Sequence, residues 1–183
     1  MNEDRRLEKL AIKAAKGSAK AYGELIEYYK EYLYRTAWLL MKNQESALDI
    51  VGECIMKGFR AIHTLQKPEF FRSWLTRILI NVANSYQRKN QDMLSLDAEE
   101  NQAIQIAAPK KGVTSEERMD LKDAIDRLPD KYRTVIILKY FDEMKISEIA
   151  YIMRIPEGSV KAYLNRARAE LRNFLKEDYL YER

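Results

Sequence analysis

Apolar residues recur every three or four positions along most of this 183-residue chain, which is the spacing of amphipathic α-helices. The first half contains four such runs. We predict one helix that ends near Gly17, a second over about 22–40, a third that begins after Asn43, and a fourth over about 70–89. No segment alternates apolar and polar residues for long, so strands are not expected. The pattern therefore predicts an all-α protein.

The third helix is predicted to have its apolar positions between Ala47 and Ile62, with Phe59 on the buried side. Asn43 can cap this helix, because an asparagine side-chain oxygen can accept a hydrogen bond from a free backbone N–H at the helix start. Pro68 lies in the break before the fourth helix. The N-terminal half is therefore expected to pack as a small helical domain.

In residues 91–114 the helical pattern fails, and the chain becomes polar and acidic with both proline and glycine. Residues 1–90 carry 16 Lys and Arg against 10 Asp and Glu, whereas residues 91–117 carry two against six. A segment of this composition buries too little apolar surface to fold by itself. We therefore predict two small helical domains, at residues 1–90 and 115–183, joined by an acidic flexible linker at residues 91–114.

The composition limits the kinds of site that the chain can carry. A single cysteine, Cys54, excludes an internal disulfide, and with the single His63 it provides too few ligands for a structural zinc site. No apolar run approaches the roughly 20 residues of a membrane span, and the charged N-terminus lacks the apolar core of a signal peptide. We expect a cytoplasmic protein with no metal, no cofactor and no segment inserted in a membrane.

Candidate catalytic groups are few. Cys54 and His63 are nine residues apart on the predicted third helix, so they lie more than two turns apart, too far for a nucleophile–base pair. The adjacent acids Glu99 and Glu100 fall in the predicted linker, where no cleft would hold them. The sequence has no glycine-rich phosphate-binding loop. It therefore predicts no catalytic residue and no enzymatic activity.

The stretch IPEGSVKAYLNRARAEL at 155–171 predicts a helix that begins near Pro156, because the missing N–H of proline would have no partner in the first helical turn. On a helical wheel Val160, Leu164 and Ala167 form a narrow apolar stripe, and a polar, basic arc lies opposite. A shorter apolar helix, ISEIAYIM, precedes it, with a tight turn between the two. This arrangement is typical of a helix-turn-helix, whose second helix enters the major groove of DNA.

The candidate residues for duplex DNA lie on the second helix, away from the apolar stripe: Ser159, Lys161, Ala162, Asn165 and Arg166. A basic face alone does not establish DNA binding, because most surface helices are rich in Lys and Arg. The helix pair, its turn and its packing residues together favour DNA binding. Arg154 is an unusual residue for the turn, where a glycine would adopt a positive φ most easily.

The fourth helix carries a second candidate surface. Its core face has six large side chains: Phe71, Leu75, Ile78, Leu79, Val82 and Tyr86. The other side suits unstacked bases, because an aromatic ring can stack, amides can read base edges and cations can hold phosphates: Trp74, Arg77, Asn81, Asn84, Ser85 and Arg88. Trp74 borders the apolar side and could equally pack in the core. Both interpretations of Trp74 stay open.

Four segments of the chain, in this order, resemble motifs of the extracytoplasmic-function (ECF) sigma factors, a group of the sigma-70 family of bacterial RNA polymerase. They are ALDIVGE (47–53), FRSWLTRILINVANSY (71–86), LPDKYRTVIILKYF (128–141) and EIAYIMRIPEGSVKAYLNRARAEL (148–171). The resemblance covers nearly the whole chain. It implies a promoter-specificity subunit that binds core RNA polymerase and promoter DNA.

The resemblance also implies a role for each part of the chain. The first domain would bind the polymerase clamp through Asp49 and Glu53, and the polar face of its fourth helix would open the downstream, −10 promoter element. The second domain would place the second helix of its helix-turn-helix in the major groove of the upstream, −35 element. Members of this family are commonly held inactive by an anti-sigma factor, often membrane-anchored, so we expect such a partner.

Several residues depart from the family pattern. Leu48 stands in place of an acid, Gly52 in place of glutamine, and Ser85 in place of a larger polar residue. Lys145 occupies the position where a serine usually caps the first helix of the pair. None of these changes removes the predicted fold. The alternatives are a stand-alone helix-turn-helix regulator, whose N-terminal domain dimerises or binds a ligand, and a structural helical adaptor with no salt-dependent DNA affinity.

Overall fold

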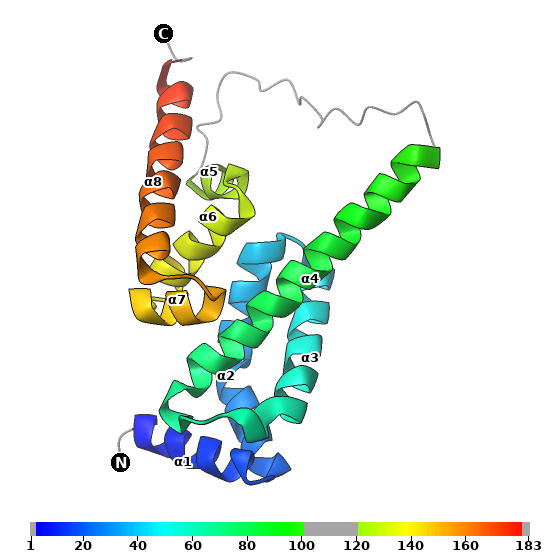
Figure 1. Cartoon of the computed structure of the whole chain (residues 1–183), viewed down its shortest axis with the longest axis vertical. Helices are drawn as coiled ribbons and strands as arrows, with labels where there is room; N and C mark the ends of the chain where they lie inside the picture. The colour runs from blue at the N-terminus through cyan, green and yellow to red at the C-terminus, as the bar shows by residue number, and fades with distance from the viewer. Residues whose placement is uncertain (1–2, 101–120, 181–183) are drawn as a thin grey trace.

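The computed structural model describes residues 3–100 and 121–180, and every regular element in these two ranges is helical, as predicted (Figure 1). The N-terminal domain consists of α1 (Glu3–Ala15), α2 (Ala19–Met41), α3 (Gln44–Ala61), the 3-10 helices η1 (Ile62–Thr64) and η2 (Pro68–Phe70), and α4 (Phe71–Glu100). The C-terminal domain consists of α5 (Leu121–Arg127), α6 (Asp130–Ile136), the π-helix η3 (Ile137–Phe141), α7 (Ile146–Met153) and α8 (Glu157–Leu180).

Local sequence signals set the starts of α2 and α3. The Ser18 hydroxyl accepts a hydrogen bond from the backbone N–H of Ala21 at 3.2 Å, and the Asn43 side-chain oxygen accepts one from the N–H of Ser46 at 2.9 Å. Gly17, between α1 and α2, has a φ of 100°, which glycine reaches without strain. The predicted end of the first helix and the predicted cap of the third are confirmed.

The N-terminal domain packs α2, α3 and α4 around large, fully buried side chains: Leu25, Leu33, Ile50, Leu75 and Leu79. At Gly58 the helices leave no room for a side chain, because a Cβ atom there would overlap the Tyr22 hydroxyl and lie 3.1 Å from Cδ1 of Leu75. The Tyr22 hydroxyl is held in place because it donates a hydrogen bond to the carbonyl of Ile55 at 2.8 Å. A glycine is therefore needed at this crossing.

The core of the C-terminal domain includes these fully buried large side chains: Val135, Ile137, Leu138, Met144, Ile149, Ile152 and Val160. α6 continues directly into η3, a π-helix, and such segments add one residue to a turn and often occur at functional sites. Tyr140 and Phe141 at the end of η3 are exposed, whereas Asp142, the next residue, is buried. This segment therefore sends an acidic side chain inward between two exposed neighbours, Phe141 and Glu143.

Some boundaries differ from the prediction. α4 continues to Glu100, beyond the predicted end near Lys89, because a helix that has already nucleated gains one hydrogen bond for each residue added. Residues 101–114 of the predicted linker, and the predicted helix start near residue 115, lie outside the described residues. α3 ends at Ala61, so His63 belongs to η1, and Phe59 is 46% exposed rather than buried.

The two domains meet along α4. α7 packs beside α4, and η3 packs beside α2. α8 packs on α5, α6 and α7, and most of its length lies away from α4 (Figure 1). α4, the helix predicted to read the open strand, therefore contacts both domains, whereas α8 contacts mainly its own domain.

Candidate nucleic-acid interface

The predicted duplex-reading residues share one outward face of α8. Val160, Leu164 and Ala167 are buried against the rest of the C-terminal domain, as the apolar stripe predicts. On the other side Lys161, Asn165 and Arg166 are exposed, and Ser159 and Ala162 are half-buried. The Asn165 side-chain oxygen already accepts a hydrogen bond from the Arg168 guanidinium. A base that uses this oxygen must therefore share it with Arg168 or displace Arg168.

The turn before α8 has the geometry that a helix-turn-helix requires. Arg154 adopts φ 55° and ψ 45°, the left-handed conformation expected at this position, and its N–H donates to the carbonyl of Ala150. The carbonyl of Pro156 accepts from the N–H groups of Ser159 and Val160 at 2.9 and 3.2 Å. Pro156 is thus the residue immediately before α8, and the predicted helix start is confirmed to within one residue.

Lys145 lacks the serine hydroxyl that would cap α7, and Glu148 of the same helix caps it instead. A lysine side chain has no acceptor for the free N–H groups at the start of α7. Instead, Glu148 accepts the backbone N–H of Lys145 through Oε2 at 2.9 Å. Its other oxygen, Oε1, accepts the hydroxyl of Ser73 on α4 at 2.7 Å. The same carboxylate therefore fixes the start of α7 and ties α7 to the other domain.

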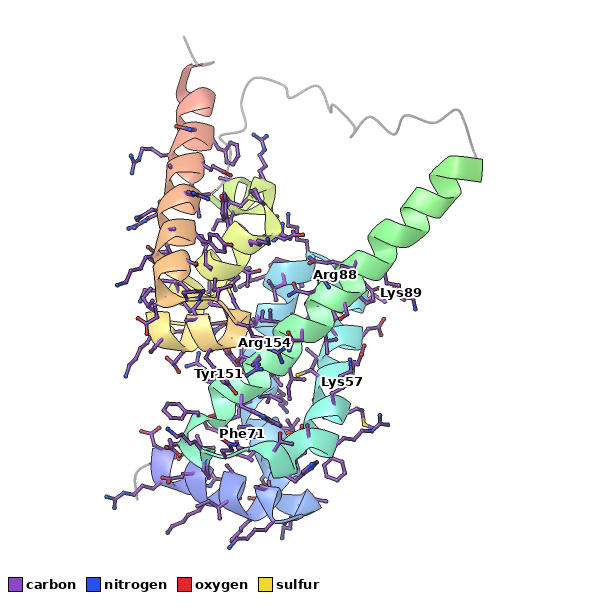
Figure 2. All side chains as sticks on the ribbon, viewed as in Figure 1. Lys57, Phe71, Arg88, Lys89, Tyr151 and Arg154 are labelled. Carbon is purple, nitrogen blue, oxygen red and sulfur yellow. The ribbon has the colours of Figure 1, made fainter. Side chains whose placement is uncertain are left out.

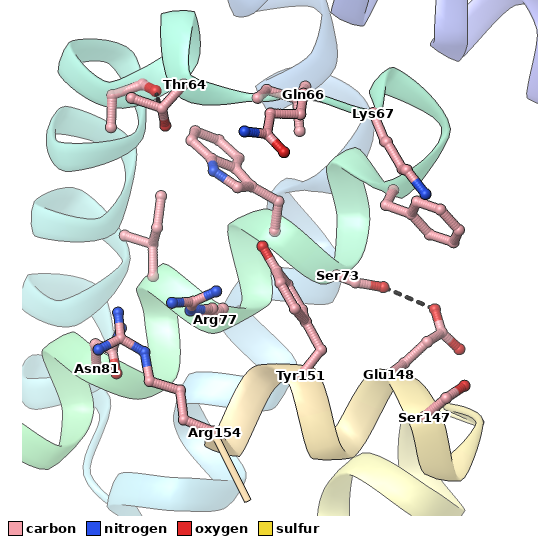
Figure 3. A pocket seen from close by; sticks show the side chains of 15 residues that line it. Thr64, Gln66, Lys67, Ser73, Arg77, Asn81, Ser147, Glu148, Tyr151 and Arg154 are labelled. Carbon is pink, nitrogen blue, oxygen red and sulfur yellow. Dashed lines mark hydrogen bonds between the residues drawn. The ribbon is translucent and has the colours of Figure 1, made fainter.

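The polar face of α4 borders the C-terminal domain, and Asn81, Asn84, Ser85 and Arg88 on it are exposed. A cavity of about 760 Å³ separates part of α4 from α7 and is lined by Trp74, Arg77 and Asn81 on one side and by Tyr151 and Arg154 on the other. Figure 3 shows Tyr151 and Arg154 reaching from α7 toward Arg77 and Asn81. The Arg77 guanidinium carbon lies 4.7 Å from the centre of the Tyr151 ring, which is the geometry of a cation–π contact.

A second hollow, of about 370 Å³, continues along the same side of α4. Asn81, Asn84 and Arg88 line it, opposite Lys131 and Tyr163 of the C-terminal domain. Five of the six residues predicted to read the open strand therefore face the other domain across these two hollows. The sixth, Ser85, donates its hydroxyl to the carbonyl of Asn81 at 2.9 Å.

Trp74 combines both interpretations that the sequence left open. Only 8% of the residue is exposed, and its ring lies 5.8 Å from that of Phe71 in the core. It also lines the cavity in front of α7. The ring is therefore a packing residue with one side at the cavity, and only that side is available to a base in this arrangement.

The predicted polymerase-binding residues lie on the outer side of α3. Asp49 and Glu53 are exposed, and Glu53 forms an ion pair with Lys57 at 2.6 Å. Leu48 and Met56 are each 53% exposed on the same helix. In the described part of the chain, no atom beyond the chain neighbours and backbone of the same helix lies within 4 Å of a Cβ placed on Gly52, so a larger side chain would fit there. This side of α3 is an accessible, partly apolar surface.

No local sequence pattern marks the buried acid that joins the domains. Both carboxylate oxygens of Asp142 lie 3.1 Å from the Thr36 hydroxyl, which donates to them. Arg72 donates to the Asp142 carbonyl at 2.6 Å. Burial raises the pKa of Asp142 above its ordinary value, and the Thr36 hydrogen bond and the charges of Arg72 and Arg35 oppose that rise. An acid after an apolar run is common at turns, so only the tertiary structure reveals this role.

The single cysteine and the single histidine of the chain lie in different environments. Cys54 is completely buried, and burial raises its pKa to about 12, so the thiolate is not accessible at neutral pH. His63 is exposed on η1. Over residues 3–100 and 121–180, no group of three or more His, Cys, Asp or Glu side chains could hold a metal ion, and no helix is long and apolar enough to cross a membrane.

Comparison with known proteins agrees with this architecture. The family model for sigma-70 region 2 matches residues 25–92, and that for sigma-70 region 4 matches residues 118–171. The chain is 36% identical over 151 residues to the RNA polymerase sigma factor SigV of Bacillus subtilis, a match that covers 82% of this chain and 89% of SigV. It is 34% identical over 173 residues to the ECF sigma factor SigW of the same organism, covering 88% and 92% of the two chains.

Two solved structures share the fold. One is CnrH in complex with the cytosolic domain of CnrY, with a TM-score of 0.69, 23% identity, and coverage of 94% of this chain and 98% of CnrH. The other is the sigma factor RpoE of Bartonella quintana in complex with the anti-sigma factor NepR, with a TM-score of 0.69, 24% identity, and coverage of 86% and 98%.

The class defined by the fold and the matches is the sigma-70 family of RNA polymerase subunits. Within that family, the chain belongs to the ECF sigma factors. It is a promoter-specificity subunit of bacterial RNA polymerase, and the stand-alone regulator considered from the sequence is not favoured.

Proposed function

We propose that the chain divides promoter recognition between its two helical surfaces. The exposed face of α8, with Ser159, Lys161, Ala162, Asn165 and Arg166, reads the upstream element as duplex. Lys161 and Arg166 supply cations for phosphates or guanine edges, and Asn165 supplies an amide for a base edge. The observation that carries this assignment is the open basic face of α8 behind a turn of helix-turn-helix geometry.

The face of α4 with Trp74, Arg77, Asn81, Asn84, Ser85 and Arg88 acts on the downstream element after its strands separate. An aromatic ring, amides and guanidiniums on successive turns of one helix suit unstacked bases better than a duplex groove. Asp49 and Glu53 on the outer side of α3 contact the polymerase clamp, next to the exposed apolar residues Leu48 and Met56. The protein itself carries out no chemical step, because nucleotide addition belongs to the polymerase.

An anti-sigma factor is the expected regulatory partner of this cytoplasmic protein. Two proteins of the same fold are seen in complex with such partners or with a cytosolic domain of another protein. We propose that a protein of this kind, often membrane-anchored, occupies the sigma factor until a signal releases it. Co-purification from the native host that recovered only polymerase under every growth condition would count against this partner.

Transcription with purified core polymerase on a promoter library tests the proposed function. We expect the chain to form a complex with the core enzyme and to direct new start sites. Lys161→Ala should alter tolerance to changes in the upstream element only, and Asp49→Ala should weaken core binding without changing promoter choice. If no complex forms and no new start sites appear, the proposed function is wrong.

A further inference from the structure

Arg168 lies beside the duplex-reading face of α8 but is not one of the five residues predicted for that face. It follows Asn165 by three residues and precedes Arg172 by four, and these spacings place side chains in one row along a helix. All three side chains are exposed. Figure 2 shows nitrogen-tipped side chains along the side of α8 that faces away from α4. Arg168 is therefore a neighbour of Asn165, the residue that supplies an amide to the duplex-reading face.

Two hydrogen bonds hold the Arg168 guanidinium against the preceding turn of α8. Its Nη2 donates to the Asn165 side-chain oxygen, and its Nε donates to the carbonyl of Leu164 at 3.3 Å. A guanidinium has donors and no acceptor, so the Asn165 amide must turn its oxygen, and not its nitrogen, toward Arg168. The NH2 group of Asn165, which has two donors, then lies on the other side of the amide. Arg168 therefore determines which end of this amide is free to meet a base.

The charge of Arg168 acts on any group that approaches the amide. Among the side chains that the structure describes, no carboxylate forms an ion pair with Arg168, so its charge is not neutralised by a neighbour. The Asn165 oxygen keeps a second lone pair, but a base donor that used it would have to approach a cation. A base acceptor meets the free NH2 group and is attracted by the same cation. The Asn165–Arg168 pair therefore favours base edges that present acceptors.

The four bases differ in what they present in the major groove. Guanine presents two acceptors, N7 and O6, thymine presents one acceptor beside a methyl group, and cytosine presents a donor. Adenine presents one acceptor and one donor, and an asparagine with both ends of its amide free bonds to both. Because Arg168 already occupies the oxygen of Asn165, the remaining NH2 group matches guanine better than adenine.

We propose that Arg168 determines specificity for one base pair of the upstream element: it holds the Asn165 amide so that the NH2 group meets the DNA, and Asn165 therefore selects guanine instead of adenine. This inference rests on the proposed function of the α8 face in reading duplex DNA. Arg168 is a positioning residue in this account, because it selects the base through Asn165 and not through a base contact of its own.

Selection from a pool of promoter duplexes with a randomised upstream element, bound by the full-length chain in complex with core polymerase and then sequenced, tests this assignment. Asn165→Ala identifies the base pair that Asn165 reads, because the preference at that position should be lost. The wild type should prefer guanine there. Arg168→Ala should lower the ratio of guanine to adenine affinity about tenfold, which is within the range of one bidentate base contact. In the Asn165→Ala background, Arg168→Ala should cause no further change of preference at that position.

Two further variants separate the orientation of the amide from the loss of a charge. Arg172→Ala is the matched control, because it removes the same charge from the same row, about two helical turns beyond Asn165. It should weaken binding to all sequences alike and leave the base preference unchanged. Arg168→Lys keeps a cation and N–H donors, so it should keep most of the preference for guanine. Circular dichroism and thermal unfolding check that the variants are folded, as the exposure of both arginines leads us to expect.

The outcomes distinguish this inference from the proposed function. If Arg168→Ala weakens binding to all sequences with an unchanged preference, Arg168 only holds a phosphate and the inference is wrong. A wild-type preference for adenine at the Asn165 position would also overturn it. If Asn165→Ala relaxes no position, the inference is wrong, whereas an effect of Lys161→Ala on the upstream element would still support the proposed function. Failure of the chain to bind core polymerase at all would overturn both.

Discussion

α4 and α8 carry similar residues in opposite settings. Both present amides and guanidiniums on one side and an apolar stripe on the other. The polar face of α8 points away from the rest of its domain, whereas the polar face of α4 borders two hollows shared with the second domain. On α4, Trp74 is buried and Arg77 is half-buried, and the four remaining residues of the face are exposed. Residue chemistry thus decides what a helix can bind, and tertiary packing decides which of its side chains are accessible.

The largest expected effect concerns Trp74, the residue that joins the α4 core to its polar face. Trp74 is only 8% exposed. Trp74→Ala removes this buried ring and should lower the free energy of unfolding by about 3–5 kcal/mol. Trp74→Phe keeps an aromatic ring beside Phe71 and should lose much less. Chemical denaturation measures both variants.

The Trp74 variants also test whether the ring stacks on a base during promoter opening. If one side of the ring stacks on a base, Trp74→Phe should slow promoter opening, and a template already mismatched over the downstream element should recover part of the rate. Unchanged opening by a well-folded Trp74→Phe would make the residue a core residue only.

Substitution of Gly58 tests how closely α3 packs against α2 and α4. Gly58→Ala places a Cβ against the bonded hydroxyl of Tyr22 and the side chain of Leu75, and should cost about 1–3 kcal/mol of unfolding free energy. Gly52→Ala on the same helix is the matched control. It meets no neighbouring atom, so it should raise stability by up to about 1 kcal/mol through helix propensity. Equal effects in the two variants would contradict the packing described for α3 and α4.

Substitutions on the exposed face of α8 should weaken DNA binding and leave the stability of the fold unchanged. Lys161→Ala and Arg166→Ala should each weaken binding to upstream duplex DNA by about 1–3 kcal/mol if the side chain reads a base, and by less if it holds a phosphate. Neither change should alter the unfolding free energy, because both side chains are exposed. Fluorescence anisotropy at several salt concentrations distinguishes base from phosphate contacts. A large loss of stability in either variant would contradict the open face.

The smallest expected effect is at the turn between α7 and α8. Arg154→Gly relieves a positive φ of 55° and should raise the unfolding free energy by up to about 1 kcal/mol, offset in part by the greater entropy of glycine in the unfolded chain. Arg154→Ala keeps the Cβ and should give no gain. Thermal unfolding of the two variants provides the comparison, and a gain from alanine would contradict the strain argument.

Sequence reasoning performed well wherever a local signal determined the structure. Asn43 and Gly17 marked helix ends, and the apolar stripe through Val160 and Ala167 gave the buried face of α8. The helix-turn-helix followed from the same periodicity, and Arg154 adopts the expected left-handed conformation. These features depend on neighbours in the chain, which a sequence contains directly.

The missed features depend on a partner distant in the sequence. A wheel of α4 shows one core face, but Ser73, Thr76 and Ile80 are buried as well. Ser73 bonds to Glu148 of α7, Ile80 lines the hollow shared with Ile152, and Thr76 hydrogen-bonds to Tyr32 of α2. Asp142 and Thr36 are 106 positions apart, and nothing in their local sequence pairs them. The Lys145 cap was likewise replaced by Glu148, whose second bond to α4 only the structure shows.

The most direct test of the two-surface account is site-specific photocrosslinking in the complete polymerase–promoter complex. A benzoylphenylalanine at position 162 probes the face of α8, and one at position 84 probes the polar face of α4. We predict that position 162 crosslinks to upstream duplex both before and after promoter opening, whereas position 84 crosslinks to the downstream non-template strand only after opening. Crosslinks from both positions to the same upstream duplex, or from position 84 before any strand separation, would contradict the account.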